Sequence, residues 1–247
     1  MDTEAIYSWI EINETGTILE KISDTTFNYQ SLQFPWDFRI YNKNYNSCVV
    51  VSSGYLVFPS GNISSMSVHI PSLYYHISPT IALFGDNLTT SESFGGGGIV
   101  YYKFLTSPNR LVIEYKDVYT YNNSKPSYVG SFEVILFFQP GVGDIKFQYK
   151  DVLSISSNQA VVGLDYGDSV HFNLYSEFNQ TNLPITEKAI KFKFDKMLSV
   201  CGNEERYGED ETPEIPGMNP VFLLLIFSIM ILSVIYILVK NKLYKYF

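Results

Sequence analysis

The sequence contains few charged residues and, before its last eight residues, no basic cluster. Only 17% of its 247 residues are Asp, Glu, Lys or Arg, whereas 46% are hydrophobic and 16% are aromatic. The formal net charge is −8, and binding to a phosphate backbone requires a basic surface. We therefore expect no nucleic-acid partner. The 20 tyrosines and 18 phenylalanines are typical of β-sheet faces and argue against a disordered chain.

Cysteine is equally scarce, with only Cys48 and Cys201. Two cysteines outside a CxxC spacing do not make a structural zinc site. If the domain faces an oxidising space, they can form one disulfide that ties the end of the folded domain to an internal strand. Two unrelated thiols fit the sequence as well, and both alternatives stay open.

Residue types that usually carry catalysis are scattered. His69, His76 and His171 lack metal-binding spacing, and neither a Gly-x-Ser-x-Gly nor a His-Glu-x-x-His motif is present. We therefore predict no catalytic residue, no cofactor and no metal site. The alternative is a pair of carboxylates brought together by folding, drawn from Asp86, Asp117, Asp144, Asp151, Asp165 and Asp168.

One long apolar run lies near the C-terminus. Val221–Val239 contains no charged residue, glycine or proline over 19 positions. A helix of this length spans about 28 Å, close to the hydrocarbon thickness of a bilayer. Pro220 precedes the run, where a helix tolerates proline. We therefore predict a transmembrane helix over residues 220–240, with the lipid bilayer as its partner.

The flanks of this helix carry opposite charge. Residues 201–219 hold six acids against a lone Arg206, and their prolines and glycines are typical of a flexible stalk. Lys240, Lys242 and Lys245 follow the run without any acid. The positive-inside rule predicts a single-pass protein with its folded domain, residues 1–200, outside. The short basic tail, residues 241–247, would lie in the cytoplasm or inside a virion.

The N-terminus argues against this orientation. Its first 14 residues have neither a basic region nor an apolar run, so they do not read as a signal peptide. A C-terminally anchored protein with a cytoplasmic domain, a processed or misassigned start, and insertion by another route, as in some viral envelope proteins, are the alternatives. We favour the outer orientation.

Residues 6–194 consist of short apolar runs separated by Gly, Pro, Asn and Asp, without helical periodicity. This pattern predicts an all-β domain, an antiparallel, jelly-roll-like β-sandwich of about twelve strands. We expect strands at Ile6–Ile12, Gln33–Ile40, Cys48–Ser52, Tyr55–Phe58, Thr80–Phe84, Ile99–Phe104, Arg110–Tyr115, Ser131–Phe138, Asp144–Tyr149, Ala160–Leu164, Val170–Leu174 and Ala189–Phe194.

Two six-residue fragments of the chain are similar. Residues 113–118 read Ile-Glu-Tyr-Lys-Asp-Val, and residues 147–152 read Phe-Gln-Tyr-Lys-Asp-Val. We predict that they end equivalent, neighbouring strands. Two copies do not establish a repeat array.

Several segments match a known family in order. Residues 7–12 (Tyr-Ser-Trp-Ile-Glu-Ile) resemble its opening strand, 32–38 (Leu-Gln-Phe-Pro-Trp-Asp-Phe) its apolar strand with Pro and Phe, and 51–58 (Val-Ser-Ser-Gly-Tyr-Leu-Val-Phe) its Gly-Tyr-Leu hairpin. Residues 110–118, 132–138, 143–152 and 161–165 complete the series. The set resembles the nidogen-type (NIDO) extracellular β-sandwich domain of secreted bacterial and archaeal surface proteins. The resemblance implies a binding or structural module without catalytic activity.

The resemblance also has departures. Residues 81–88 (Ile-Ala-Leu-Phe-Gly-Asp-Asn-Leu) correspond to a family segment that reads Ile-Ala-Pro-Phe-Trp-Asp-Asp-Leu. Leu83 stands in place of the proline, Gly85 in place of the large aromatic residue and Asn87 in place of the second acid. If the family uses that acidic pair for an ion, this chain has lost half of it.

Asparagine sites for glycosylation occur across the predicted domain. Five Asn-x-Ser/Thr motifs would fit a glycosylated outer surface, at Asn13, Asn62, Asn87, Asn122 and Asn179. We therefore expect a membrane-anchored, non-enzymatic surface or envelope glycoprotein whose domain serves binding, adhesion or structural assembly. Its partners would be other surface or envelope proteins, glycans or copies of itself. The alternative is a membrane-tethered hydrolase that acts on surface polysaccharide through paired acids.

Overall fold

The computed structural model describes residues 1–2, 5–23, 28–40, 43–59, 78–91, 97–121, 127–139, 142–153, 160–167, 172–176 and 186–193. All of these residues belong to the first of two compact units, Met1–Met197. No helix among them is long and apolar enough to cross a membrane. The predicted helix Val221–Val239, the acidic stalk and the basic tail lie outside the described residues.

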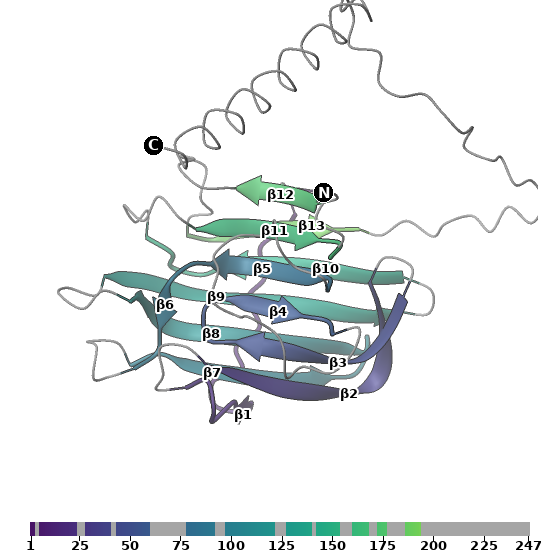
Figure 1. The fold of residues 1–247 in the computed structure, drawn as a ribbon, viewed down its shortest axis with the longest axis horizontal. Helices are drawn as coiled ribbons and strands as arrows, with labels where there is room; N and C mark the ends of the chain where they lie inside the picture. The colour runs from purple at the N-terminus through teal and green to yellow at the C-terminus, as the bar shows by residue number, and fades with distance from the viewer. Residues whose placement is uncertain are drawn as a thin grey trace, which may run out of the picture. The chain divides into compact units, whose positions relative to one another are not determined.

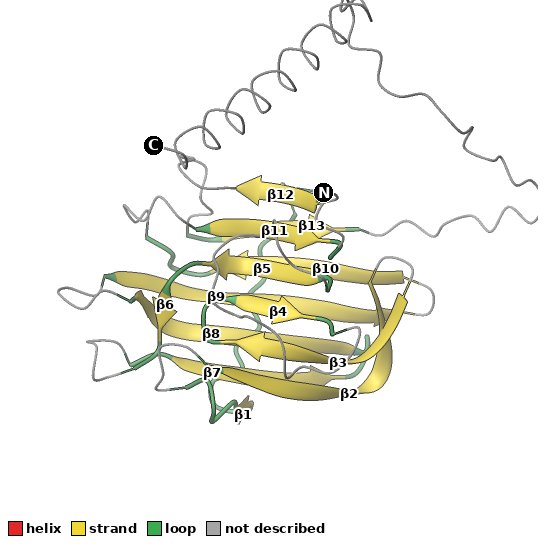
Figure 2. Ribbon diagram, viewed as in Figure 1, coloured by secondary structure: helices red, strands yellow, loops and turns green. Residues whose placement is uncertain are grey.

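The described strands form two antiparallel sheets (Figures 1 and 2). Sheet A has the order β1-β7-β8-β9-β10-β13, with β6 paired to β8. Sheet B has the order β12-β11-β5-β4-β3-β2. The strands are β1 Thr17–Ile18, β2 Tyr29–Ile40, β3 Lys43–Val51, β4 Tyr55–Val57, β5 Thr80–Gly85, β6 Leu88–Thr89, β7 Ile99–Leu105, β8 Arg110–Thr120, β9 Tyr128–Gln139, β10 Val142–Tyr149, β11 Val161–Asp165, β12 Phe172–Ser176 and β13 Lys188–Phe192.

The two sheets enclose a hydrophobic core that strand alternation builds. In β8, Leu111, Ile113 and Tyr115 belong to the core between the sheets, whereas Val112 belongs to a separate apolar cluster on the outer face of sheet A. Successive side chains of a strand point to opposite faces, so Glu114 also faces outward. The expectation of an all-β, sandwich-like domain is confirmed.

Aromatic rings fill the centre of this core. Phe132 of β9 stacks on Tyr115, with 5.1 Å between ring centroids, and lies 5.7 Å from Phe84 of β5 and 6.4 Å from Tyr149 of β10. All four side chains are fully buried. Ring contacts of this kind add stabilisation to that of the buried area alone.

Eleven of the twelve expected strands are confirmed, with shifted ends. The sequence pattern missed β1 and β6 because each has only two residues, too few to show alternation.

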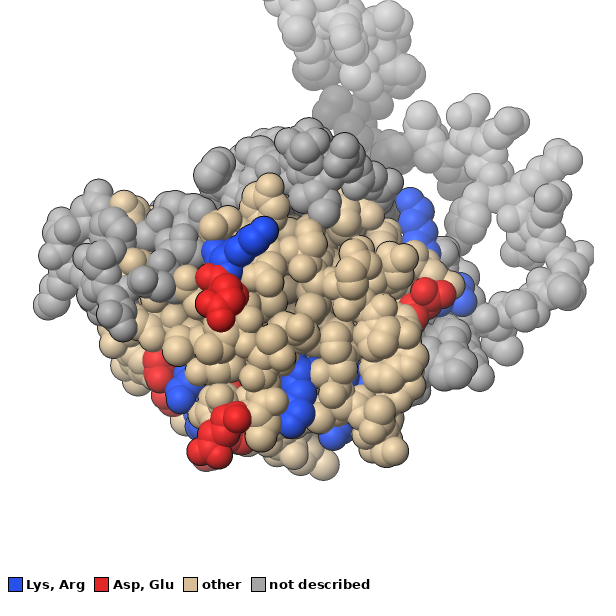
Figure 3. Space-filling model, turned by 90° about the horizontal axis from the view of Figure 1, so that it is seen from below, with Lys and Arg blue, Asp and Glu red and all other residues tan. Residues whose placement is uncertain are grey.

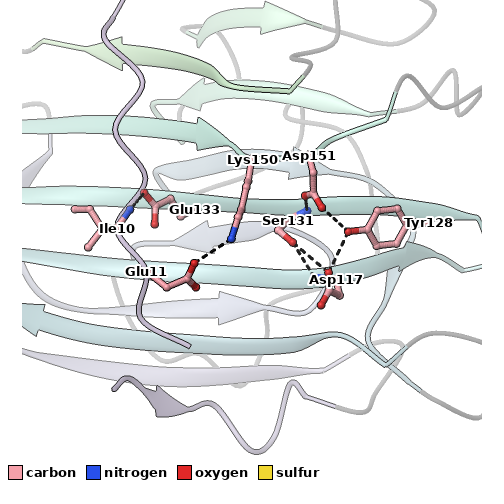
Figure 4. Close-up of polar contacts among 8 residues, drawn as sticks. All are labelled: Ile10, Glu11, Asp117, Tyr128, Ser131, Glu133, Lys150 and Asp151. Carbon is pink, nitrogen blue, oxygen red and sulfur yellow. Dashed lines mark hydrogen bonds and ion pairs between the residues drawn. The ribbon is translucent and has the colours of Figure 1, made fainter. Parts of the chain in front are cut away.

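The expected strand at Ile6–Ile12 is wrong. Residues 6–12, which we call the crossing segment, run across the strands of sheet A (Figure 4). Its backbone is bonded by side chains of the sheet: Ser8 N donates to Gln148 Oε1 at 2.6 Å, and Gln148 Nε2 donates to Ser8 O at 2.6 Å. An extended chain whose backbone groups are hydrogen-bonded by side chains can alternate like a strand without pairing with another strand.

Candidate functional site

The N-terminal part of the chain reaches from one end of sheet A to the other. Asp2 forms a backbone bridge to Lys191 of β13, with N–O distances of 2.7 and 2.8 Å. The crossing segment then passes over β10, β9 and β8 (Figure 4). Beyond it, β1 pairs with β7. The outer face of sheet A is therefore covered along one line by the chain itself.

A row of three polar side chains lies beneath the crossing segment. Gln148 of β10 is the register partner of Glu133 of β9, which is in turn the partner of Glu114 of β8. All three are at most 1% exposed. Gln148 Nε2 also donates to Glu133 Oε1 at 2.5 Å. The row is therefore connected within itself and lies directly under the segment that it binds.

Glu133 and Glu114 bind the next two alternate amides of the crossing segment. The amide of Ile10 donates to Glu133 Oε1 at 3.2 Å, and the backbone of Ile12 forms a hydrogen bond with Glu114. Together with Gln148, the row therefore binds every second residue of the extended segment. This spacing fits an extended chain, in which every second residue faces the same side.

Both glutamates have a strongly raised pKa. Burial raises the pKa of Glu133 to about 8, with Glu114 adding to the effect and hydrogen bonds from Gln148 and Ile10 opposing it. Burial likewise raises the pKa of Glu114 to about 7, with the charge of Glu11 adding to it. Each carboxyl has one oxygen, Oε2, that is buried without a hydrogen-bond partner among the described residues.

The two similar fragments, residues 113–118 and 147–152, lie on either side of β9. The prediction that they end neighbouring strands needs correction, because β9 separates β8 from β10. Glu114 and Gln148 occupy the same position in the two fragments, and both bind the crossing segment. The repeat therefore marks two strands, on either side of β9, that each contribute a side chain to bind the crossing segment.

The tyrosines of these fragments connect the two sheets. Tyr115 Oη donates to the carbonyl of Val51 on β3 at 2.6 Å, and Tyr149 Oη donates to the carbonyl of Leu83 on β5 at 2.7 Å. Both tyrosines are fully buried, and burial raises the pKa of each well above its usual range. Two hydroxyls of sheet A therefore bind main-chain oxygens of sheet B inside the core.

The aspartates of the fragments converge on β9 (Figure 4). Tyr128 Oη lies 2.7 Å from Asp151 Oδ2 and 3.0 Å from Asp117 Oδ1. The amide of Ser131 donates to Asp151 Oδ1 at 2.7 Å, and the amide of Asp117 donates to Ser131 Oγ at 3.2 Å. Asp117 has a φ of 52° at a register shift between β8 and β9, so a bulge turns its carboxylate toward β9.

This cluster is a pair of carboxylates joined by one phenol. Burial and the hydrogen bonds to Asp151 and Asp117 raise the pKa of Tyr128, so its hydroxyl keeps its proton. A phenol has one proton and donates to one carboxylate at a time. Since Tyr128 and Ser131 already bind both aspartates, the arrangement fastens the ends of β8, β9 and β10 together.

Asp151→Asn is expected to destabilise the domain by about 1–2 kcal/mol, because the amide replaces one acceptor of Tyr128 or Ser131 with a donor. Urea unfolding of the full-length chain in neutral detergent measures the loss. Asp37→Asn is the matched control, because Asp37 of β2 is exposed and should tolerate the change. Equal stability of the two variants would contradict a fastening role for Asp151.

The other predicted acids serve local structure where they are described. Asp86 Oδ1 accepts from the amide of Asn87 at 2.7 Å, and Asp165 Oδ1 accepts from the amide of Gly167 at 2.8 Å. Asp144 pairs with the Lys191 ammonium at 2.7 Å. Asp117 and Asp151 are brought to one shared hydrogen-bond partner, Tyr128.

The remaining candidate residues are partly described. Cys48 is a fully buried thiol in the core, and burial raises its pKa. Asn87 Nδ2 donates to the carbonyl of Tyr121 at 3.4 Å, and Asn13 is half-buried in the turn after the crossing segment. The pairing with Cys201 and the glycan sites stay predictions. The residues outside the described part are Asn62, His69, His76, Asn122, Asp168, His171, Asn179 and Cys201.

Charge is sparse on one face of the described domain. The face in Figure 3 shows a few Lys, Arg, Asp and Glu side chains, some of them next to a residue of opposite charge, among uncharged residues. One exposed pair joins Lys150 Nζ to Glu11 Oε2 at 2.9 Å, and the same ammonium lies 5.4 Å from the ring centre of Trp9. Within the described residues, no three His, Cys, Asp or Glu side chains are placed to hold a metal ion.

A comparison with protein-family models shows to which family this chain is related. A family model described as NIDO related matches residues 2–194, which include every described strand. The chain belongs to this family. The predicted resemblance to the nidogen-type domain is thereby confirmed. No curated protein and no solved structure matches the chain significantly.

One departure from the NIDO pattern has a local explanation. Gly85 stands where the pattern has a large aromatic residue, and the ring of Tyr55 from β4 occupies the space that a side chain at Gly85 would need. Tyr55 is 4% exposed. A side chain at position 85 would therefore collide with the ring of Tyr55.

Sequence reasoning missed several residues of the site, namely Glu114, Tyr128, Ser131, Glu133 and Gln148. The signal that could have found two of them is the repeat, because Glu114 and Gln148 precede its tyrosines. Acidic or amide side chains facing outward from adjacent strands normally meet solvent. Here the crossing segment lies over them.

Proposed function

We propose that this protein is a single-pass, non-enzymatic surface or envelope protein whose NIDO-related, jelly-roll-like sandwich serves binding, adhesion or assembly. In this proposal, residues 220–240 cross the membrane, residues 201–219 form an acidic stalk and residues 241–247 form the cytoplasmic or virion-interior tail. The observation that carries it is the use of the aspartate pair. Asp117 and Asp151 are engaged by Tyr128 and by Ser131, so they support the fold instead of a reaction.

The orientation and partners follow from the sequence. The positive-inside rule favours an outer domain, and the family resemblance points to extracellular surface proteins. Glycans, other surface proteins and further copies of the chain are the partners we propose. Sheet B ends in β2 and β12, and the end of a sheet can accept a strand of another chain.

Amine-reactive cross-linking in intact membranes tests the proposal. We expect covalent species larger than the monomer, formed through exposed lysines of the domain such as Lys43 and Lys193. A variant with Lys240, Lys242 and Lys245 changed to Arg separates domain contacts from contacts of the tail, and it should still cross-link. A chain that stays monomeric and captures no partner would contradict assembly.

The hydrolase alternative makes the opposite prediction for the aspartate pair. If Asp117 and Asp151 hydrolyse surface polysaccharide, the full-length chain should release sugars, and Asp117→Asn should abolish the release while the variant still folds. We expect no release from either chain. Activity that disappears in this folded variant would overturn the proposal.

A further inference from the structure

The crossing segment is bound by two buried glutamates, and it costs free energy for both of them to be ionised at once. Glu114 and Glu133 are directly opposite each other on neighbouring strands, are 1% and 0% exposed, and each has one buried oxygen without a partner among the described residues. Buried carboxylates lose hydration, and two of them side by side also repel each other. One proton removes the repulsion, and protonation of both carboxyls removes both costs.

Among the described residues, neither glutamate forms an ion pair with a lysine or an arginine. Lys150, whose charge opposes the rise in the pKa of Glu114, is bound to exposed Glu11. Electrostatic contributions to the two glutamates, and to the groups beside them, come from the crossing segment and from every strand beneath it. These groups are Tyr7 and Glu11 of the segment, Lys116 of β8, Lys146 of β10, Lys150 and Asp151 after β10, Glu187 before β13 and Lys191 of β13.

We propose that Glu114 and Glu133 form a proton-dependent latch for the crossing segment. Protonated, the pair keeps residues 6–12 on sheet A through the amides of Ile10 and Ile12. When the pair loses its protons, repulsion and hydration favour the open state, in which the segment leaves the sheet. The device is independent of the membrane and partner proposals above.

Opening would uncover an apolar surface. Ile12 packs with Tyr101, Val112 and Ile135, each at most 9% exposed, on the outer face of sheet A. Ile10 packs against the same cluster. Release of the segment would remove both isoleucines and leave side chains of three neighbouring strands open to solvent or to a partner.

The direction of the pH effect follows from proton linkage. The closed state has acids with pKa values of about 7 and about 8, whereas solvated glutamates have a pKa of about 4.3. The closed state therefore binds more protons, and closure is strongest at acidic pH. The equilibrium constant for closure falls as the pH rises from about 5 to about 8, by up to tenfold per pH unit for each acid. Above that range it changes little.

Amide hydrogen exchange in the full-length chain, in neutral detergent, tests the latch. Among the described residues, the amides of Ser8 and Ile10 are hydrogen-bonded to side chains of the row alone, so their protection factors report closure. We expect a fall of at least tenfold between pH 5.5 and pH 8.5, after correction for intrinsic exchange. The amide of Leu19, bonded to the carbonyl of Val100, is the internal reference and should change little.

Two variants assign the effect to the acids. Glu114→Gln with Glu133→Gln keeps the shape of both side chains and removes both protons from titration, so protection at Ser8 should become independent of pH. Glu20→Gln is the matched control at an exposed site and should behave as the parent. If the double variant does not fold, Glu133→Gln alone should make the protection factor of Ser8 less dependent on pH in the upper part of the pH range.

Emission from Trp9 gives a second readout. Trp36→Phe leaves Trp9 as the sole tryptophan, and its emission should shift to longer wavelength as the segment opens. Flat protection in the parent, or an unchanged pH dependence in the glutamine variants, would overturn the latch. Opening caused by a metal chelator at constant pH would also overturn it, because a cation and not a proton would then hold the pair.

Discussion

Phe132→Ala is expected to destabilise the domain by about 3–5 kcal/mol, the usual cost of removing a buried phenylalanine ring. Phe132 is fully buried between Phe84 of sheet B and Tyr115 and Tyr149 of sheet A. Its loss leaves a cavity beside both tyrosines that bind across the core. Urea unfolding of the full-length chain in neutral detergent, followed by near-ultraviolet circular dichroism, measures the change.

Phe137→Ala is the control for this large effect. Phe137 lies on the same strand but is only half-buried, on the outer face of sheet A, where it packs at the edge of the outer cluster. Its loss should cost clearly less than that of Phe132. If the two variants were equally unstable, the core between the sheets would not be centred on Phe132.

Tyr115→Phe combined with Tyr149→Phe should cost about 2–3 kcal/mol, since each change removes a buried hydroxyl and leaves a main-chain oxygen with one partner fewer. The rings stay, so the loss isolates the two hydrogen bonds to Val51 and Leu83. Both tyrosines contact Phe132. The two single changes are therefore expected to be coupled instead of additive.

Tyr101→Phe is the matched control for the tyrosine pair. Tyr101 is 9% exposed and packs in the outer cluster of sheet A, so it makes no tie between the sheets. We expect its unfolding midpoint to match that of the parent. A double variant as stable as this control would show that the hydroxyls do not connect the sheets.

The strands of the domain were predictable because each side of the sandwich imposes a period of two on the sequence. In β13, Ile190 and Phe192 are buried while Lys191 is more exposed, as the alternation in residues 190–194 predicts. The family resemblance matched segments along the chain and did not give the order of the strands within the sheets. The pairing of β8 and β10 with β9 was not predictable, because the two similar fragments only appear to belong to adjacent strands.

The site could not be predicted, because the feature that creates it is local in space and not in sequence. Residues 6–12 alternate like a strand, and nothing in them indicates that Gln148 and Glu133, more than 120 residues away, replace a partner strand. Likewise, Glu114 and Glu133 appear as ordinary outward residues of sheet A. Their burial and raised pKa arise only once the N-terminal part of the chain lies across them.

For the aspartate pair, the sequence suggested that acids could come together but not which groups they would bind. The sequence raised paired acids as the basis of an enzyme alternative, and the fold does bring Asp117 and Asp151 to one phenol. Their partners are internal, however, and include the amide of Ser131. This use favours a role in stability and supports the proposal of a binding or assembly module.

Cleavage of the acidic stalk on intact cells or particles tests the central proposal most directly. A Glu-specific protease should cut within residues 201–219, which hold five glutamates, and release the folded domain while a tag after residue 247 stays protected. A variant with these glutamates changed to Gln should resist release and serve as the control. Our proposal predicts cleavage without lysis. Cleavage only after lysis would place the domain inside and contradict the proposed surface role.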